Sequence, residues 1–198
     1  MRSHCSLVIL AGGRSRRMGQ DKATLPADDG TLIEHLARRL APVVDETIIA
    51  GGSVAAPFEG ARLVADRQPG LGPLSGMLAG FAAAKRRHVW VVACDLPDVE
   101  PALGGLLLAL VGDYEAVVPR PDEEPEAVCA LYVRELGPRI EALLEAGGRS
   151  IKSLLDRSTV RYVTSDELRA VDPQLRSFRN INTPADYEAW LKTRPVSR

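Results

Sequence analysis

The sequence predicts an α/β fold in which helices cover a mostly parallel central sheet. Short apolar runs alternate along the chain with segments of helical periodicity, which is the pattern of a parallel sheet with covering helices. The chain has 198 residues, 45% of them apolar, so it suits one domain with a substantial core. We expect a single domain over residues 1–198, with a change of character after Pro119.

Each element follows from a local pattern. Apolar runs predict strands at residues 7–10, 47–50, 62–65, 89–93, 116–119, 128–133 and 161–164. Leucines at helical spacing predict helices through Leu32, Leu36 and Leu40, around Leu78 and Phe81, and from Leu103 to Leu110. Two further helices are expected at residues 136–146 and 150–156, separated by a glycine pair.

The last helix has a clear start. Thr183 can cap it, Pro184 suits its first turn, and Asp186 follows the cap by three residues. Its apolar side chains Tyr187, Trp190 and Leu191 are then expected to face the body of the protein. Capping accounts for Thr183 and Pro184 but leaves Asn180 and Asn182 unexplained.

Composition and charge exclude several classes of protein. The net charge of −1 and the 5% aromatic content give no general field or stacking surface for nucleic acid. Cys5, Cys94 and Cys129 are an odd number without a Cys-x-x-Cys pair, which favours a reducing compartment. The apolar stretch at residues 7–11 is too short for a signal peptide, and no run approaches a membrane span. These observations predict a cytoplasmic protein without a membrane partner.

Residues 10–26 carry the strongest functional signal. The first predicted strand leads directly into Gly12 and Gly13, and four cations follow within nine residues: Arg14, Arg16, Arg17 and Lys22. Glycines let the backbone approach a ligand with its N–H groups, and the cations neutralise charge, so the segment suits a polyphosphate. Its spacing fits neither the Walker loop nor the dinucleotide-binding fingerprint.

Asp95 ends the predicted strand at residues 89–93, on the edge of the sheet where α/β proteins bind ligands. Because magnesium takes one or two carboxylates together with phosphate oxygens, Asp95 is our candidate metal ligand. From position alone, Asp95 could equally cap a helix or open the turn at Pro97.

The motifs together resemble the molybdenum cofactor guanylyltransferases, a family of nucleotidyltransferases, from Leu7 to about Trp190. The matching strings are Leu-Ala-Gly-Gly (10–13), Arg-Arg-Met-Gly (16–19), Asp-Lys (21–22), Gly-Pro-Leu-x-Gly (72–76), Cys-Asp-x-Pro (94–97) and Asn-x-Asn-Thr-Pro (180–184). The segment from Glu126 to Tyr132 is similar to a further family motif, with Ala127 in place of proline. Ala50 stands where the family often has asparagine, which weakens the assignment of guanine.

The resemblance implies a Rossmann-like three-layer sandwich that transfers a guanylyl group from GTP to a molybdopterin-type cofactor with magnesium. It places a nucleotide-binding part at residues 1–119 and an acceptor-side part at residues 120–198, which includes Asn180 and Asn182. Catalytic roles are implied for Arg17, Lys22 and Asp95. The nucleotide site implied by the resemblance comprises Leu10, Ala11, Gly12, Gly13, Lys22, Asp66, Gly76 and Asp95. Transient contact with enzymes that make or receive the cofactor is also expected.

Three alternatives stay open at this point. A sibling enzyme could use CTP or another phosphorylated acceptor, and sugar-phosphate nucleotidyltransferases share the glycine pair but usually have longer chains. The third is a GTP-binding module that has lost catalysis, suggested by Ala50 and Ala127 and opposed by the presence of Lys22 and Asp95.

Overall fold

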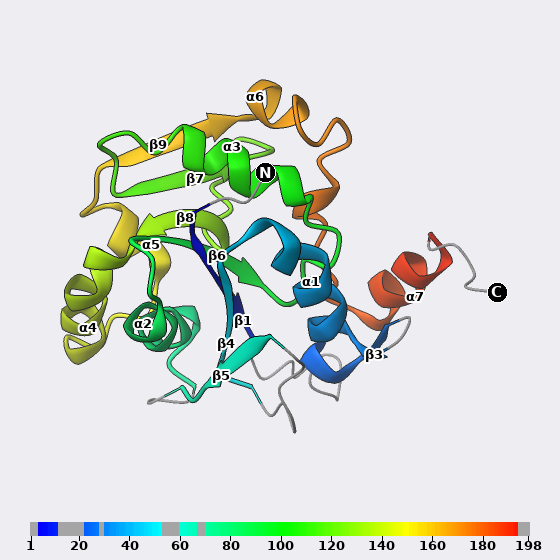
Figure 1. Ribbon diagram of the computed structural model, residues 1–198, viewed down its shortest axis with the longest axis horizontal. Helices are drawn as coiled ribbons and strands as arrows, with labels where there is room; N and C mark the ends of the chain where they lie inside the picture. Colours follow the sequence, from blue (N-terminus) through cyan, green and yellow to red (C-terminus); the bar gives the residue numbers. More distant parts are fainter. Residues whose placement is uncertain (1–3, 12–21, 28–29, 53–59, 67–69, 194–198) are drawn as a thin grey trace.

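The computed structural model describes residues 4–11, 22–27, 30–52, 60–66 and 70–193. Helices pack on both faces of a central seven-stranded sheet with the strand order β5-β4-β1-β6-β8-β7-β9 (Figure 1). The strands are β1 (Ser6–Leu10), β4 (Glu46–Ala50), β5 (Ala61–Val64), β6 (His88–Ala93), β7 (Ala116–Arg120), β8 (Cys129–Val133) and β9 (Val160–Thr164). The helices are α1 (Leu32–Leu40), α2 (Pro73–Ala83), α3 (Pro101–Ala109), α4 (Gly137–Glu145), α5 (Ile151–Leu155), α6 (Ser165–Arg169) and α7 (Pro184–Lys192).

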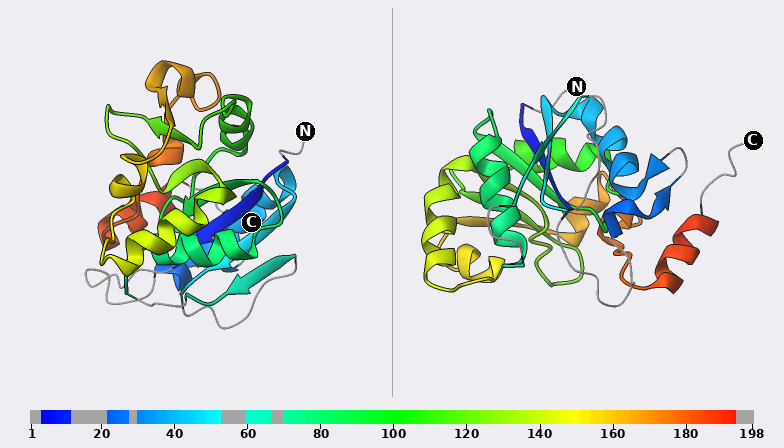
Figure 2. Two further views of the ribbon diagram at one scale, coloured as in Figure 1. Left: turned by 90° about the vertical axis from the view of Figure 1, so that its left-hand side faces the viewer. Right: turned by 90° about the horizontal axis from the view of Figure 1, so that it is seen from below.

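The predicted α/β sandwich is confirmed, and its three layers follow from strand alternation. Along β1, Leu7 and Ile9 point to one face of the sheet while Val8 and Leu10 point to the other. The first face packs against α1, α3 and α6, and the second against α2, α4 and α5. Two views at right angles to the first show these helices on opposite sides of the sheet (Figure 2).

Strand direction explains where ligands can bind. β1 pairs in parallel with both β4 and β6, and β4 pairs in parallel with β5, so these four strands end at one edge. β8 is antiparallel to both β6 and β7. The short connection at residues 121–128 accounts for this, because a parallel return requires a longer crossover. Strands from residues 1–119 and from residues 120–198 thus belong to one sheet.

Four features differ from the sequence-based expectations. A small hairpin of β2 (Pro26–Ala27) and β3 (Gly30–Thr31) precedes α1, and α6 follows β9; neither element was predicted. β5 ends at Val64, one residue before the predicted strand at residues 62–65 ends, and Asp66 lies in the loop that follows. In α7, Trp190 is buried as expected, but the expectation for Leu191 is wrong, since it is 40% exposed.

Capping boxes mark where three helices, α1, α6 and α7, begin. Thr31 and Glu34 form a capping box at the start of α1, and Thr183 and Asp186 form another at the start of α7. The sequence-based interpretation of Thr183 and Pro184 as a helix start is therefore confirmed. No helix within the described ranges is long and apolar enough to cross a membrane.

Candidate active site

The carboxyl ends of β1 and β6 bring two predicted site segments together. Leu10 and Ala93 are paired residues of the two strands, and the Cys94 N–H donates to the Leu10 carbonyl at 3.1 Å. On the other side of β1, the Ala11 N–H donates to the Ala50 carbonyl at 3.0 Å. The chain therefore leaves β1 and β6 at the same edge, where the predicted nucleotide-binding segment follows one strand and Asp95 follows the other.

The ammonium group of Lys22 is the centre of the described site. Its Nζ lies 3.1 Å from Asp95 Oδ2 and 2.8 Å from Asn182 Oδ1, although these partners are 73 and 160 residues away in sequence. The side chains of Lys22 and Asp95 are only 15% and 24% exposed. Water screens this pair less than a surface ion pair, so its charges act strongly on any ligand placed beside them.

A backbone contact and a cap place Asn182 at this position. The Ile181 N–H donates to the Asp95 carbonyl at 2.9 Å, which joins the chain before α7 to the end of β6. The Asn182 N–H donates to Asp186 Oδ2 at 3.0 Å, and the Thr183 N–H donates to the same oxygen at 2.8 Å. Hydrogen bonds from Thr183 and Asn182 hold the pKa of Asp186 below its usual range. The helix cap and the site therefore share Asp186.

Asn180 is not brought to the same point. It is exposed, and its side chain makes no hydrogen bond or ion pair to the residues that the structure describes. Of the two asparagines predicted from the motif, only Asn182 contacts Lys22.

Asp66 and Gly76 lie on the β4–β5 side of the site. Ser75 Oγ donates to Asp66 Oδ1, which joins the loop after β5 to the first turn of α2. A Cβ added at Gly76 would stand 3.1 Å from Leu10 Cδ2 and 3.8 Å from the Ala50 carbonyl. Gly76 thus lets α2 approach the ends of β1 and β4, which places Asp66, Ser75 and Leu10 around one region.

A second glycine pair escaped the sequence analysis. Gly51 and Gly52 follow β4 with φ values of 78° and 79°, in the left-handed region that glycine adopts easily. A Cβ at Gly52 would lie 2.8 Å from the Ala11 carbonyl oxygen, closer than real side chains come. The pair follows its strand as Gly12 and Gly13 follow theirs, and this repetition was the available signal.

Glu126 is a further acidic group near Asp95, which the sequence analysis named only as the first residue of a motif. Val92 pairs with Cys129, and the Ala93 N–H donates to the Val128 carbonyl at 2.8 Å, so residues 126–128 run beside the chain that leads to Asp95. Burial, and then the charge of Asp95, raise the pKa of the Glu126 carboxyl. Its place in the motif from Glu126 to Tyr132 was the signal in the sequence.

Three predicted residues, Gly12, Gly13 and Arg17, lie outside the described residues. The described part of the chain holds no group of three or more histidine, cysteine or acidic side chains able to form a metal site by themselves. The arrangement around Lys22 offers instead one cation, one carboxylate oxygen and one amide oxygen. Such a set suits a ligand that carries much of its own negative charge.

Comparison with known proteins identifies the family and agrees with the fold. Residues 7–162 match the MobA-like NTP transferase domain. A relative from Methanosarcina mazei, named a probable molybdenum cofactor guanylyltransferase, is 34% identical and the match covers 96% of this chain and 91% of that protein. A protein of the same name from Pelotomaculum thermopropionicum is 37% identical over 90% of this chain and 88% of its own.

Solved structures show the same architecture. The crystal structure of molybdopterin-guanine dinucleotide biosynthesis protein A from Archaeoglobus fulgidus superposes with a TM-score of 0.81 and 27% sequence identity. The superposition covers 93% of this chain and 95% of that one. The likeness therefore extends beyond the domain match at residues 7–162 to nearly the whole chain.

Proposed function

The chain belongs to the MobA-like NTP transferase family and is a nucleotidyltransferase, and we propose that it transfers GMP from GTP to a molybdopterin-type molybdenum cofactor. The observation that carries this proposal is the convergence of Lys22, Asp95 and Asn182 on one point at the carboxyl edge of the sheet. A triphosphate placed there would meet the glycine loop that follows β1 and the carboxylate that follows β6.

The donor set at this point fits a divalent cation. Asp95 and Asn182 present oxygen atoms, the ligand type that magnesium prefers, and magnesium usually takes one or two carboxylates plus phosphate oxygens and water. Asp95 would hold the ion, with the Asn182 amide oxygen beside it. A bound magnesium ion would supply charge neutralisation to the triphosphate.

The reaction needs positioning more than covalent chemistry. An oxygen of the acceptor's terminal phosphate forms a bond to the α-phosphorus of GTP, and the bond from that phosphorus to the bridging oxygen breaks. Pyrophosphate leaves with the electron pair of the broken bond. The acceptor phosphate is already ionised near neutral pH, so no general base is required. The chain's contribution is alignment of the two phosphates and neutralisation of the charge that develops.

Each residue has a role in this proposal. Lys22 and Arg17 neutralise the charge on the departing pyrophosphate, and the backbone N–H groups at Gly12 and Gly13 bind phosphate oxygens. Asp66, oriented by Ser75, binds the base or the ribose, and a carboxylate suits the adjacent N1–H and N2 donors of guanine. Leu10, Ala11 and Gly76 form the floor beside the nucleotide, while Asn180 and Asn182 lie on the acceptor side.

One observation favours a second candidate, a related enzyme that uses CTP. Ala50 lies at the end of β4, within 4 Å of the Cβ position at Gly76, and its methyl group cannot hydrogen-bond a base or a ribose. Discrimination of the base therefore depends on Asp66 and on backbone groups, which a different base could also satisfy.

Binding and turnover together test the proposal. We expect calorimetry with magnesium to show tighter binding of GTP than of CTP or ATP, and GTP with molybdopterin to release pyrophosphate. Tighter binding and turnover of CTP would establish the sibling activity instead. Binding of GTP with no pyrophosphate release on any phosphorylated acceptor would indicate a non-catalytic module.

A further inference from the structure

The segment that carries Asn182 is held in place by a small apolar cluster separate from the two main cores. Leu25, Ala27, Leu32, Ile181 and Trp190 form this cluster, and Tyr187 packs against it. Leu25 follows Lys22 by three residues and Ile181 directly precedes Asn182. Both sides of the contact between Lys22 and Asn182 are therefore anchored in the same cluster.

Trp190 is the largest member of this cluster and makes its most specific contact. Its side chain is buried, and its indole Nε1–H donates to Asp98 Oδ1 at 3.0 Å. The ring meets His35 of α1 edge-on at 5.6 Å between centroids and stacks on Tyr187 at 6.1 Å. The Tyr187 hydroxyl in turn donates to the Pro26 carbonyl of the small hairpin.

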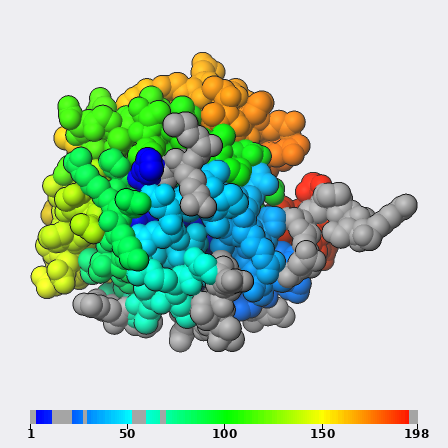
Figure 3. Space-filling view, in the orientation of Figure 1, coloured from blue at the N-terminus to red at the C-terminus, as the bar shows by residue number. Residues whose placement is uncertain are grey.

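These contacts join two segments of the chain at three places. The segment after β6 provides the Asp95 carbonyl, the Asp95 carboxylate and the Asp98 carboxylate. In the C-terminal segment, residues 180–192, the Ile181 N–H donates to the Asp95 carbonyl and the Trp190 indole donates to Asp98. Asn182 and the Asp95 carboxylate are linked through Lys22, which donates to both. In the ribbon and space-filling views, α7 lies at the side of the molecule beside the segment that leads into α1 (Figures 1 and 3).

We propose that Trp190 is a positioning residue, which sets the Asn182 amide oxygen against Lys22 through its hydrogen bond to Asp98 and its packing on α1. The Asn182 side chain is exposed, and its backbone is held by the contact between Ile181 and Asp95 and by the cap of α7, so its orientation depends on how α7 is seated. The position of α7 decides where its amide points. This inference rests on the proposed function, because the proposed function gives Lys22 its role at the pyrophosphate and Asn182 its place beside the magnesium ion and the acceptor.

A double-mutant cycle tests whether Trp190 acts through Asn182. Trp190→Phe keeps an aromatic ring but removes the indole N–H, and we expect the rate of pyrophosphate release to fall about tenfold, as one lost hydrogen bond can cause. In an Asn182→Ala background, the same substitution should cost less than about twofold, because groups that act as a unit are not additive. The proposal would be overturned if the losses of rate in the two variants were additive in the double mutant. It would also be overturned if the rate of Trp190→Phe alone stayed within twofold of the wild type.

Asp98, which accepts the hydrogen bond from Trp190, provides a second test in which the tryptophan is kept. Asp98→Asn retains an acceptor oxygen, so it should keep most of the activity, whereas Asp98→Leu should resemble Trp190→Phe. Equal damage by both Asp98 variants would show that the acceptor role is mistaken. This pair also decides the question if Trp190→Phe does not fold.

Trp90→Phe is the matched control for a general loss of stability. Trp90 is fully buried in the main core, and its Nε1 has no hydrogen-bond partner in the described part of the molecule. Its replacement should lower the melting temperature while the rate, measured well below melting, stays unchanged. An equal fall in rate for Trp90→Phe would mean that Trp190→Phe lowers the rate only by destabilising the protein.

The same cycle can be measured on the affinity for magnesium and GTP by calorimetry. If the wild type binds the nucleotide but transfers it to no acceptor, the proposed function fails, and the cycle on affinity still decides the role of Trp190. If the wild type is active and the cycle is additive, the proposed function stands and the positioning role fails.

Discussion

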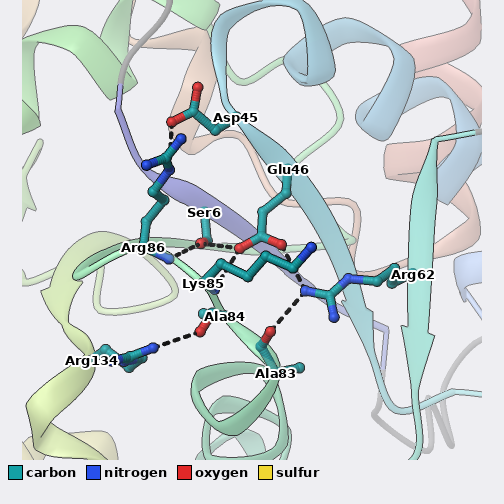
Figure 4. A network of polar contacts seen from close by, with 9 residues as sticks. All are labelled: Ser6, Asp45, Glu46, Arg62, Ala83, Ala84, Lys85, Arg86 and Arg134. Atoms are coloured by element: carbon teal, nitrogen blue, oxygen red, sulfur yellow. Dashed lines mark hydrogen bonds and ion pairs between the residues drawn. The ribbon is translucent and has the colours of Figure 1, made fainter.

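The amino edge and the carboxyl edge of the central sheet, where its parallel strands begin and end, use charged side chains in opposite ways. At the amino edge, the Glu46 carboxylate accepts from Ser6 Oγ at 2.6 Å, from the Lys85 N–H at 2.6 Å and from Arg62 at 2.6 Å (Figure 4). At the carboxyl edge, the Lys22 ammonium is held by one carboxylate and one amide oxygen. At the amino edge, both oxygens of the Glu46 carboxylate accept hydrogen bonds from other residues of the protein. The arrangement at the carboxyl edge joins a cation to two oxygen atoms at the point where we propose that a triphosphate and magnesium bind.

The amino edge continues into a wider network. Arg62 also donates to the Ala83 carbonyl at the end of α2, and the Arg86 N–H donates to Ser6 Oγ at 3.2 Å (Figure 4). The Arg86 guanidinium meets Asp45 at 2.7 Å. This network joins β1, β4, β5 and the chain that follows α2. The ion pairs at the amino edge join structural elements, whereas the pair at the carboxyl edge belongs to the site we propose for catalysis, and each can be removed separately.

The largest expected effect separates the two edges directly. Lys22→Ala should lower the turnover number by about 10²–10³-fold, the usual cost of one donor that stabilises developing charge. A stopped or continuous assay of pyrophosphate release measures this fall in the turnover number. Arg62→Ala is the matched control, since Arg62 is also a cation paired with a carboxylate, and its turnover should be unchanged. A Lys22 variant within about threefold of the wild type would remove Lys22 from the site.

Asp95→Asn tests the cation at the carboxyl edge. The amide keeps the size of the side chain but loses its charge, so a higher magnesium concentration should be needed for half-maximal turnover, or turnover should vanish. A titration of rate against magnesium concentration shows the change. An unaltered magnesium dependence would mean that Asp95 is not a ligand.

Glu46→Ala should act on stability alone. It leaves the donors of Ser6, Lys85 and Arg62 without their acceptor, which costs about 1–3 kcal/mol in the free energy of unfolding. Denaturant unfolding measures this, and Glu135→Ala provides a control, because the Glu135 pair with Arg87 is largely exposed and should change stability by less than about 1 kcal/mol. A fall in turnover for Glu46→Ala would mean that the two edges are coupled.

The smallest expected effect is a dependence of stability on pH. Burial alone would raise the pKa of Glu46, but hydrogen bonds from Ser6, Lys85 and Arg62 together with the charge of Arg62 outweigh it and lower the pKa below the ordinary 4.5. A carboxyl whose pKa is lower in the folded state stabilises the fold above pH 4.5, and this contribution is lost as the pH falls through the folded pKa.

The matching variant is Glu46→Gln. Its free energy of unfolding should decline less steeply than that of the wild type between neutral and acidic pH. Only part of the slope should disappear, because Glu115, Glu167 and Asp186 also have lowered pKa values. An identical slope in both proteins would show that the network does not lower the pKa of Glu46.

Much of this molecule is predictable from local pattern. The apolar runs predict all seven strands of the main sheet to within a few residues, because alternation and burial are properties of short segments. The motifs around Lys22, Asp95 and Asn182 predict a shared ligand site. The hairpin before α1 and the short helix α6 escaped prediction, since strands and helices of so few residues carry little periodic signal.

Contacts between distant residues needed the fold. Nothing local to Asn182 predicts that its amide oxygen lies 2.8 Å from Lys22, and nothing local to Glu46 predicts Arg62 and Ser6 as partners. The sequence by itself determined the strands, their covering helices and the resemblance to the nucleotidyltransferase family. Only the tertiary structure decided which carboxylate meets which cation and which residues α7 packs against, because partners far apart in the chain are chosen by strand order and helix packing.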